Sequence, residues 1–267
     1  MRTLTVLLVS LALLTMACIT NTSGTHDSTQ SPQSYQYTCD FLIYNVQGKF
    51  QNKMRIEATH TRGLPGDMMR WNQASIAFGT SLDGEFTPPM KQPYMENFAY
   101  PATQSKNMLT GDFYKGFPAT PIGFMMRGIV VDVHTFDIMI PFIDNLELNK
   151  TFRCISNTMN MDLFEHQGNQ NLKNLDLTWT GNSQMNGKSC SVIYFQSSVD
   201  SVSITVPGAN YDSSTIWWGN IWVTPGDKQI EYATIYEHTV IVPPDSEAKI
   251  KDVQSIYRTL TLKKMNK

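Results

Sequence analysis

The chain alternates apolar and polar residues with a period of two over many short stretches. The cleanest case is residues 54–58, where Met54, Ile56 and Ala58 are separated by Arg55 and Glu57. Successive side chains of a β-strand point to opposite faces, so this pattern places one face on a core and one in water. Antiparallel sheets commonly leave one face in solvent, whereas parallel sheets are usually buried on both. The pattern therefore predicts antiparallel strands.

The strongest single element is a long β-hairpin expected over residues 214–242. Its arms are rich in Ile, Val, Thr, Tyr and Trp, which suit a pleated, half-buried surface. Between the arms, Pro225 and Gly226 match a type II turn, in which proline presets φ and glycine accepts a positive φ. The sequence thus predicts a hairpin that turns at these two residues.

Similar stretches recur along the chain, separated by loops rich in Gly, Pro, Asn and Ser. Residues 157–170 match either a short helix or a polar loop, and no repeat of fixed period occurs. We expect a mainly β domain with a single antiparallel curved sheet (an open barrel, half barrel or sandwich), long C-terminal meander strands and little helix. The strands expected outside the hairpin lie at 35–43, 50–59, 69–79, 128–137, 175–181, 189–197, 202–206 and 253–263.

The charge composition argues against binding to nucleic acid or to an anionic membrane surface. Charged residues make up 16% of the 267 residues, which is low for a soluble protein, and the formal net charge is −2. Binding to nucleic acid or to an anionic membrane surface relies on clusters of Lys and Arg. No basic block occurs in the chain, so we expect no nucleic-acid partner.

The first 18 residues have the features of an export sequence. A basic residue, Arg2, precedes an apolar run at residues 4–14 that is too short to cross a membrane, so residues 1–17 are expected to be a signal peptide. Cys18 directly follows the small residue Ala17, and a polar stretch follows it. This arrangement resembles the lipobox of bacterial lipoproteins, although Thr15 stands where that family usually has Leu. The resemblance implies that Cys18 is lipidated and anchors the protein to a membrane.

The rest of the chain divides into two parts. Residues 18–34 are rich in Thr, Ser, Asn and Gln and are expected to form a polar tether, because they offer too little apolar surface to offset ordering entropy. Residues 35–267 are expected to form the single β-rich domain. A lipidated terminus, a tether and long meandering strands resemble envelope lipoproteins with the lipoprotein-carrier (LolA-like) half-barrel. The resemblance implies a cell-envelope location, and the alternative is ordinary cleavage that leaves a secreted protein.

Three further cysteines, Cys39, Cys154 and Cys190, remain in the domain. An exported protein permits a disulfide, and three cysteines allow at most one, whose pairing the sequence leaves open. Each cysteine also lies among alternating apolar residues, where a buried free thiol is ordinary. No CxxC motif occurs, which argues against a structural zinc site.

The best local cluster of chemical groups is Asp132 and His134, with Thr135 or Asp137 beside them. On a strand, residues two apart share a face, so Asp132 and His134 are weak candidates for metal ligands or for a base and its orienting partner. Either role needs a third group from elsewhere, and the ordinary alternative is a histidine hydrogen-bonded to a neighbour. HExxH, GxSxG, GxGxxG and P-loop motifs are absent. We therefore lean against an enzyme and expect no cofactor.

Methionines and aromatic residues offer a different function. The chain contains 15 Met, whose flexible side chains either fill a core or line a cavity for an irregular apolar ligand. Aromatic residues gather on the hairpin, where Trp218 and Trp222 share one face and Trp217 lies on the other with Ile221 and Val223. Such faces pack a core or stack on sugars.

Three hypotheses remain open at this level. The first is an exported lipoprotein that binds a lipid or other hydrophobic ligand, without catalysis, in a cavity of the sheet. The second is a metal-dependent or other hydrolase that uses Asp132 and His134. The third is a structural or partner-binding envelope protein with exposed Trp residues as interface anchors.

Overall fold

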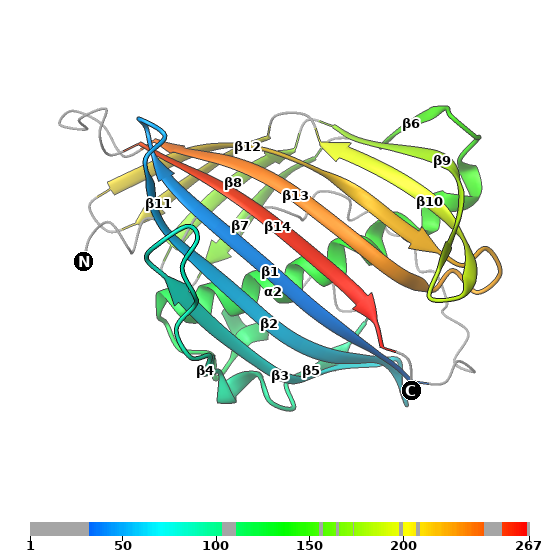
Figure 1. The fold of residues 1–267 in the computed structure, drawn as a ribbon, viewed down its shortest axis with the longest axis horizontal. Coiled ribbons are helices and arrows are strands. Elements are labelled where there is room, and N and C mark those ends of the chain that lie inside the picture. Colours follow the sequence, from blue (N-terminus) through cyan, green and yellow to red (C-terminus); the bar gives the residue numbers. More distant parts are fainter. Residues whose placement is uncertain are drawn as a thin grey trace.

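The computed structural model describes residues 32–102, 111–154, 157–163, 166–172, 174–197, 200–206, 209–242 and 253–265. Within these residues, fourteen strands form one curved sheet, and one long α-helix, α2, lies against its inner face (Figure 1). All pairs of strands are antiparallel in this part of the chain. The predicted open, antiparallel, curved sheet is therefore confirmed. The strands are β1 (Gln33–Asn45), β2 (Phe50–Leu64), β3 (Met68–Gly79), β4 (Met90–Lys91), β5 (Ala99–Pro101), β6 (Thr151–Cys154), β7 (Asn157–Leu163), β8 (His166–Leu172), β9 (Leu175–Met185), β10 (Lys188–Ser197), β11 (Asp200–Val206), β12 (Ala209–Val223), β13 (Ile230–Val242) and β14 (Gln254–Lys264).

The sheet joins the first and last strands of the domain. Its main path runs β4-β3-β2-β1-β14-β13-β12-β10-β9-β6, so β1 and β14 are neighbours at its centre. The sheet branches at β12, because the first half of β12 pairs with β11 and its second half pairs with β10. Strands β8 and β7 extend the β11 branch, and β5 adds to β3. The expected C-terminal meander of long strands is present as β12, β13 and β14.

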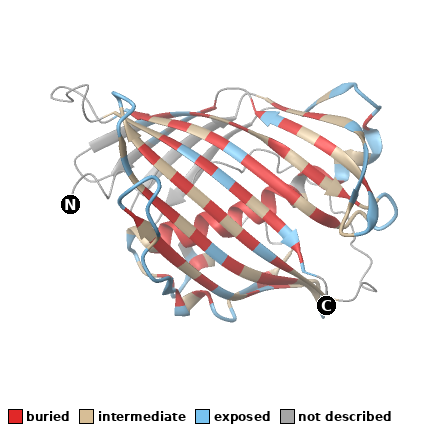
Figure 2. Ribbon diagram, viewed as in Figure 1, coloured by how far each residue is buried: buried red, intermediate tan, exposed pale blue. Residues whose placement is uncertain are grey.

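Alternation along the strands sorts side chains between the two faces of the sheet. In Figure 2, buried and exposed bands alternate along the central strands. On the hairpin, Trp217, Ile221 and Val223 are buried, whereas Trp218 and Trp222 lie half-buried on the outer face, as the sequence predicts. Inward-facing residues of β1 and β2 complete the same core layer. They are Tyr35, Tyr37, Cys39, Phe41, Ile43, Met54, Ile56 and Ala58.

The prediction of a strand at residues 128–137 is wrong, because this segment belongs to α2 (Pro121–Met139). The helix begins after Thr120, whose hydroxyl accepts a hydrogen bond from the backbone N–H of Gly123, and a proline occupies the first helical position. Its middle is buried on all sides, so it lacks the one-sided apolar stripe that marks a surface helix. Pro141 follows directly and forces a change to the 3₁₀ turn η5 (Ile140–Asn145). Burial on the sheet thus overrides the β propensity of this Val-rich run.

No helix among the described residues has both the length and the apolar composition required to cross a bilayer.

Two local predictions are also corrected. Residues 157–170 were expected to be a short helix or a polar loop, yet they contribute to the paired strands β7 and β8. In the first of these strands, Met159, Met161 and Leu163 alternate with Asn160 and Asp162, but this period-two pattern is too short to predict a strand by itself. At the hairpin turn, Gly226 does not adopt a positive φ; Lys228 does, at 52°. The predicted type II turn is therefore replaced by a longer loop, closed by the Thr224 N–H donating to the Gln229 carbonyl.

Aromatic rings fill the space between α2 and the β3 side of the sheet. They come from the segment that contains the 3₁₀ turns η2 (Pro93–Met95) and η4 (Gly111–Tyr114). Phe98 lies at the centre, with ring centroids 4.8 Å from Phe117 and 5.4 Å from Tyr100. The concave side of the sheet is consequently packed with protein in this region, and a pocket lies where the helix ends.

Candidate functional site

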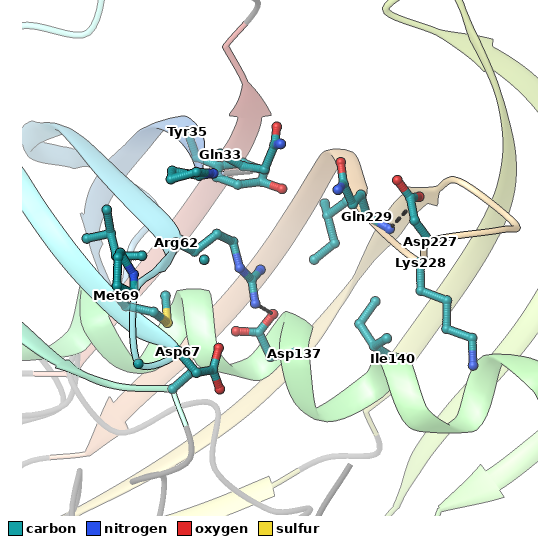
Figure 3. Close-up of a pocket in the computed structure, with 17 residues that line it drawn as sticks. Gln33, Tyr35, Arg62, Asp67, Met69, Asp137, Ile140, Asp227, Lys228 and Gln229 are labelled. Atoms are coloured by element: carbon teal, nitrogen blue, oxygen red, sulfur yellow. Dashed lines mark hydrogen bonds and ion pairs between the residues drawn. The ribbon is translucent and has the colours of Figure 1, made fainter. Parts of the chain in front are cut away.

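A pocket of about 320 Å³ opens where the C-terminal end of α2 meets the sheet (Figure 3). Four segments surround it: the start of β1, the β2–β3 turn, the last turn of α2 and the β12–β13 loop. Its walls are partly apolar, from Tyr35, Leu64, Met69, Ile140 and Ile230. The volume lies at the lower end of the range of small-molecule sites, which is about 300–1,000 Å³.

The polar floor of the pocket is an ion pair between β2 and α2. Nη2 of Arg62 lies 2.5 Å from Oδ1 of Asp137, and the two side chains are 18% and 15% exposed. Figure 3 shows the two groups pointing toward each other across the pocket. Burial acts to lower the pKa of Arg62, but the Asp137 carboxylate together with Tyr35 and Tyr100 outweighs burial, so that pKa is raised. Burial also raises the pKa of the adjacent Tyr35 to about 12. The floor therefore contains one positive and one negative group that neutralise each other.

The mouth of the pocket carries more acid than base. Asp67 follows Gly66 in the β2–β3 turn, and both residues have positive φ, at 53° and 79°. On the opposite side, Asp227 accepts a hydrogen bond from the backbone N–H of Gln229, and Lys228 forms an ion pair with Asp144 of η5. Two cationic and three anionic side chains line the whole pocket, which gives it a formal net charge of −1.

The structure does not bring the predicted pair Asp132 and His134 onto one face. Both lie on α2, where residues two apart point about 200° away from each other, so the shared face expected of a strand is lost. Asp132 accepts hydrogen bonds from Tyr37 at 2.6 Å and from Arg258 at 2.7 Å. His134 is buried, and burial lowers its pKa. Within the described residues, no three His, Cys, Asp or Glu side chains lie close enough together to hold a metal ion.

Asp132 instead belongs to a buried charge cluster that joins the helix to the sheet. Arg258 Nε lies 3.1 Å from Glu237 Oε2, an ion pair whose atoms are not aligned for a hydrogen bond. Thr239 donates to the other Glu237 oxygen at 2.7 Å. Burial raises the pKa of Glu237, and the opposing attraction of Arg258 is smaller. One cation thus faces two carboxyl groups, and burial shifts the pKa of Glu237 upward.

The cysteines are placed in part. Cys39 and Cys190 are buried free thiols, so they do not form the disulfide that the sequence permits. Burial raises the pKa of each thiol. The side chain of Cys154 and the whole of residues 1–31, including Cys18, lie outside the described residues. Lipidation of Cys18 stays a prediction.

Sequence reasoning missed the residues that build the pocket. Residues 62–67 (RGLPGD) are a recognisable Gly- and Pro-containing turn that ends in an acid and begins with a base. The sequence shows this turn, but the residue that pairs with its Arg62, Asp137, was predicted to lie on a strand with Asp132 and His134. Assigning the helix correctly brings Asp137 alone to the end of the sheet that holds the turn.

Comparison with known proteins adds little. No protein-family model and no curated protein sequence matches the chain. Among solved structures, it is similar to a lipovitellin structure on lipid–protein interactions, with TM-score 0.43, 10% identity and 88% of this chain covered. The chain spans only 25% of that lipovitellin chain. A putative AttH from Nitrosomonas europaea gives TM-score 0.18 at 10% identity, covering 80% of this chain and 69% of that one. The outer membrane protein OmpT of Vibrio cholerae gives TM-score 0.18 at 6% identity, covering 88% and 99%. These TM-scores are too low for any conclusion to rest on them.

Proposed function

We propose that this protein binds a small amphiphilic ligand in the pocket at the end of α2, without catalysing a reaction on it. The observation that carries the proposal is the pairing of apolar walls with the neutralised Arg62–Asp137 floor. Because the two buried charges already satisfy each other, an apolar group can enter beside them without leaving either one unpaired. The acidic mouth then faces the polar end of the ligand.

The volume of the pocket limits the size of the ligand. At about 320 Å³ it accommodates one short chain or a small ring system, because the rest of the concave side is filled by α2 and the aromatic cluster. The ligand class is therefore a single-chain or compact amphiphile. A lipid with several acyl chains would need α2 to leave the sheet.

We also propose that the protein is exported and anchored to the cell envelope through a lipid on Cys18. The support is the N-terminal sequence, with its apolar run and the Ala17-Cys18 junction. The test is to express the full chain and a Cys18→Ala variant in an exporting host and to compare membrane and soluble fractions. The wild type should sediment with membranes, and its N-terminal peptide should carry acyl mass. A soluble wild type with an unmodified Cys18 would show ordinary secretion instead.

The binding proposal is tested on the mature protein by native mass spectrometry, followed by organic extraction of whatever remains bound. A co-purifying amphiphile, or one-to-one binding of an added single-chain amphiphile such as dodecylamine, is the expected result. Leu64→Trp should weaken binding about tenfold or more, because the half-buried Leu64 lines the pocket and a larger side chain would fill it.

The matched control is Leu82→Trp, the same change at an exposed position that does not line the pocket. It should bind like the wild type. If no single-chain amphiphile binds to the wild type, or if both Trp variants bind equally well, the pocket is not the ligand site.

A further inference from the structure

The outer face of the β12–β13 hairpin carries a row of aromatic side chains that the core does not use. Trp218 and Trp222 of β12 point to this face, and so do Tyr232 and Tyr236 of β13. Tyr236 is 39% exposed, and the other three rings are half-buried. In Figure 1 this is the face turned toward the viewer, with α2 behind the sheet. The pocket at the end of α2 lies on the other side.

The rings form two cross-strand pairs. Trp218 lies opposite Tyr236 with ring centroids 6.1 Å apart and planes inclined by 26°, and Trp222 lies opposite Tyr232 at 5.3 Å. The pairs are four residues apart on each strand, about 13 Å at the usual rise of a strand. Because each ring is fixed by its cross-strand partner, the rings are ordered before any ligand arrives.

Hydrogen-bonding groups without charge lie between and beside the two pairs. Asn220 and Thr234 form the cross-strand pair that separates them, and the backbone N–H of Asn220 donates to the Thr234 hydroxyl. On β10, Tyr194 and Gln196 lie opposite Asn220 and Trp218, and the Tyr194 hydroxyl donates to the Gln196 side chain. Thr234 is buried, so the accessible polar groups are the Asn220 amide between the ring pairs and the Tyr194 hydroxyl and Gln196 amide beside them.

Between Ser214 and Val240, the outward positions of these two strands carry no Lys, Arg, Asp or Glu. The nearest charges on this face are the exposed Lys263 of β14, opposite Tyr232, and the exposed Asp212 near the start of β12. The outward positions are Ser214, Ile216, Trp218, Asn220 and Trp222 on β12, and Tyr232, Thr234, Tyr236, His238 and Val240 on β13. Two acids of this hairpin, Glu231 and Glu237, face inward and are buried. An anionic membrane or a nucleic acid needs cationic groups, and none is present on these two strands to receive it. Because only Lys263 of β14 borders the rings, the ring-bearing stretch of the hairpin favours a ligand without charge.

We propose that the aromatic face formed by Trp218, Trp222, Tyr232 and Tyr236 binds an uncharged polysaccharide. The apolar C–H face of a sugar ring stacks on an aromatic ring, whose face carries the negative part of its quadrupole. Sugar hydroxyls then reach the amide and hydroxyl groups between the rings. A protein interface core would exclude water with contiguous apolar packing, whereas polar Asn220 and Thr234 interrupt the rings here. This site is separate from the pocket and does not depend on its ligand.

The test is affinity electrophoresis of the mature protein in native gels that contain mixed-linkage β-glucan, xyloglucan, dextran or soluble starch. At least one of these neutral polymers should retard the wild type and change its Trp fluorescence. Trp218→Ala and Tyr236→Ala should each weaken binding about tenfold, as expected for the loss of one stacking ring. The control is Leu148→Ala, which removes an exposed apolar side chain away from the hairpin and should bind normally. Each variant is first checked for wild-type thermal unfolding.

Several results would overturn the proposal. One is the absence of retardation in all four neutral polymers. Another is retardation only in an anionic polymer such as dextran sulfate. A third is a Trp218→Ala or Tyr236→Ala variant that binds like the Leu148→Ala control. If the protein binds phosphatidylcholine vesicles and Trp218→Ala abolishes that binding, the face contacts a membrane surface instead. If the wild type is a dimer that Trp218→Ala dissociates, the face contacts a second copy of the chain.

Discussion

Arg258 of β14 donates a hydrogen bond to Asp132 of α2 at 2.7 Å, although the two residues are 126 positions apart in the sequence. Their side chains are 2% and 3% exposed. Tyr37 of β1 donates to the same Asp132 carboxylate, and Arg258 also pairs with Glu237 of β13, so the Asp132–Arg258 pair links the helix to three strands. The cluster is the principal polar attachment of α2 to the centre of the sheet.

Arg258→Met should therefore lower the free energy of unfolding by about 3–5 kcal/mol, since it leaves two buried carboxylates without a cation. Urea denaturation of the wild type and the variant measures the change. Arg153→Met is the control, because Arg153 forms a solvent-exposed pair with Asp176 and its loss should leave the free energy of unfolding almost unchanged. Equal losses in the two variants would show that the buried cluster does not hold the helix.

Glu237 should make the protein less stable as the pH rises. Burial raises its pKa above the usual range in the folded state, so its stabilising contribution is present at low pH and is lost as the pH rises through the folded pKa. Glu237→Gln introduces a side chain with the shape of the protonated acid that cannot ionise. The difference in unfolding free energy, variant minus wild type, should grow from acidic to mildly alkaline pH. A difference that is constant with pH would show that Glu237 is ionised throughout.

His60 should give the opposite pH dependence. Its ring stacks on Tyr35, with centroids 5.2 Å apart, and burial lowers its pKa to about 3. Folding therefore favours the neutral ring, and this stability is present above the ordinary pKa of 6.5 and is lost as the pH falls toward 3. His60→Phe keeps the stacking and cannot take up the proton. Acid denaturation of His60→Phe should begin at lower pH than that of the wild type, and coincident transitions would contradict the assignment.

The acidic mouth of the pocket should select the polar end of the ligand. With a net charge of −1 in its lining, the pocket should bind dodecylamine more tightly than the chain-matched laurate. Asp67→Asn removes one charge at the rim and should reduce the preference about fivefold, the effect of about 1 kcal/mol in water. Isothermal titration with both amphiphiles measures it. Tighter binding of laurate than of dodecylamine would mean that Arg62 opens to receive anions.

The sequence predicted the strands that have one buried face and one solvent-exposed face. Strands such as β1, β2 and β13 alternate between core and solvent, and that alternation is visible residue by residue. The helix α2 was missed because it is buried all round, so its Val-rich middle has the composition of a strand and no helical stripe. The pocket and the Arg258 cluster were missed because both join residues that only the curvature of the sheet brings together. Long-range pairing of this kind leaves no local pattern.

The central position of β1 beside β14 has a consequence for how the chain folds. Tyr35 pairs with Lys264, and the register continues to Asn45 and Gln254, so the middle of the sheet joins the first and the last of the described strands. Contacts of such long sequence separation impose a large loop-closure cost before they stabilise anything, and chains dominated by them fold slowly. Until β14 pairs with β1, α2 has no Arg258 to neutralise Asp132. The sheet is then incomplete, and its exposed apolar surface is prone to aggregation. We therefore expect refolding to be slow and to depend on a chaperone that shields the unfinished sheet.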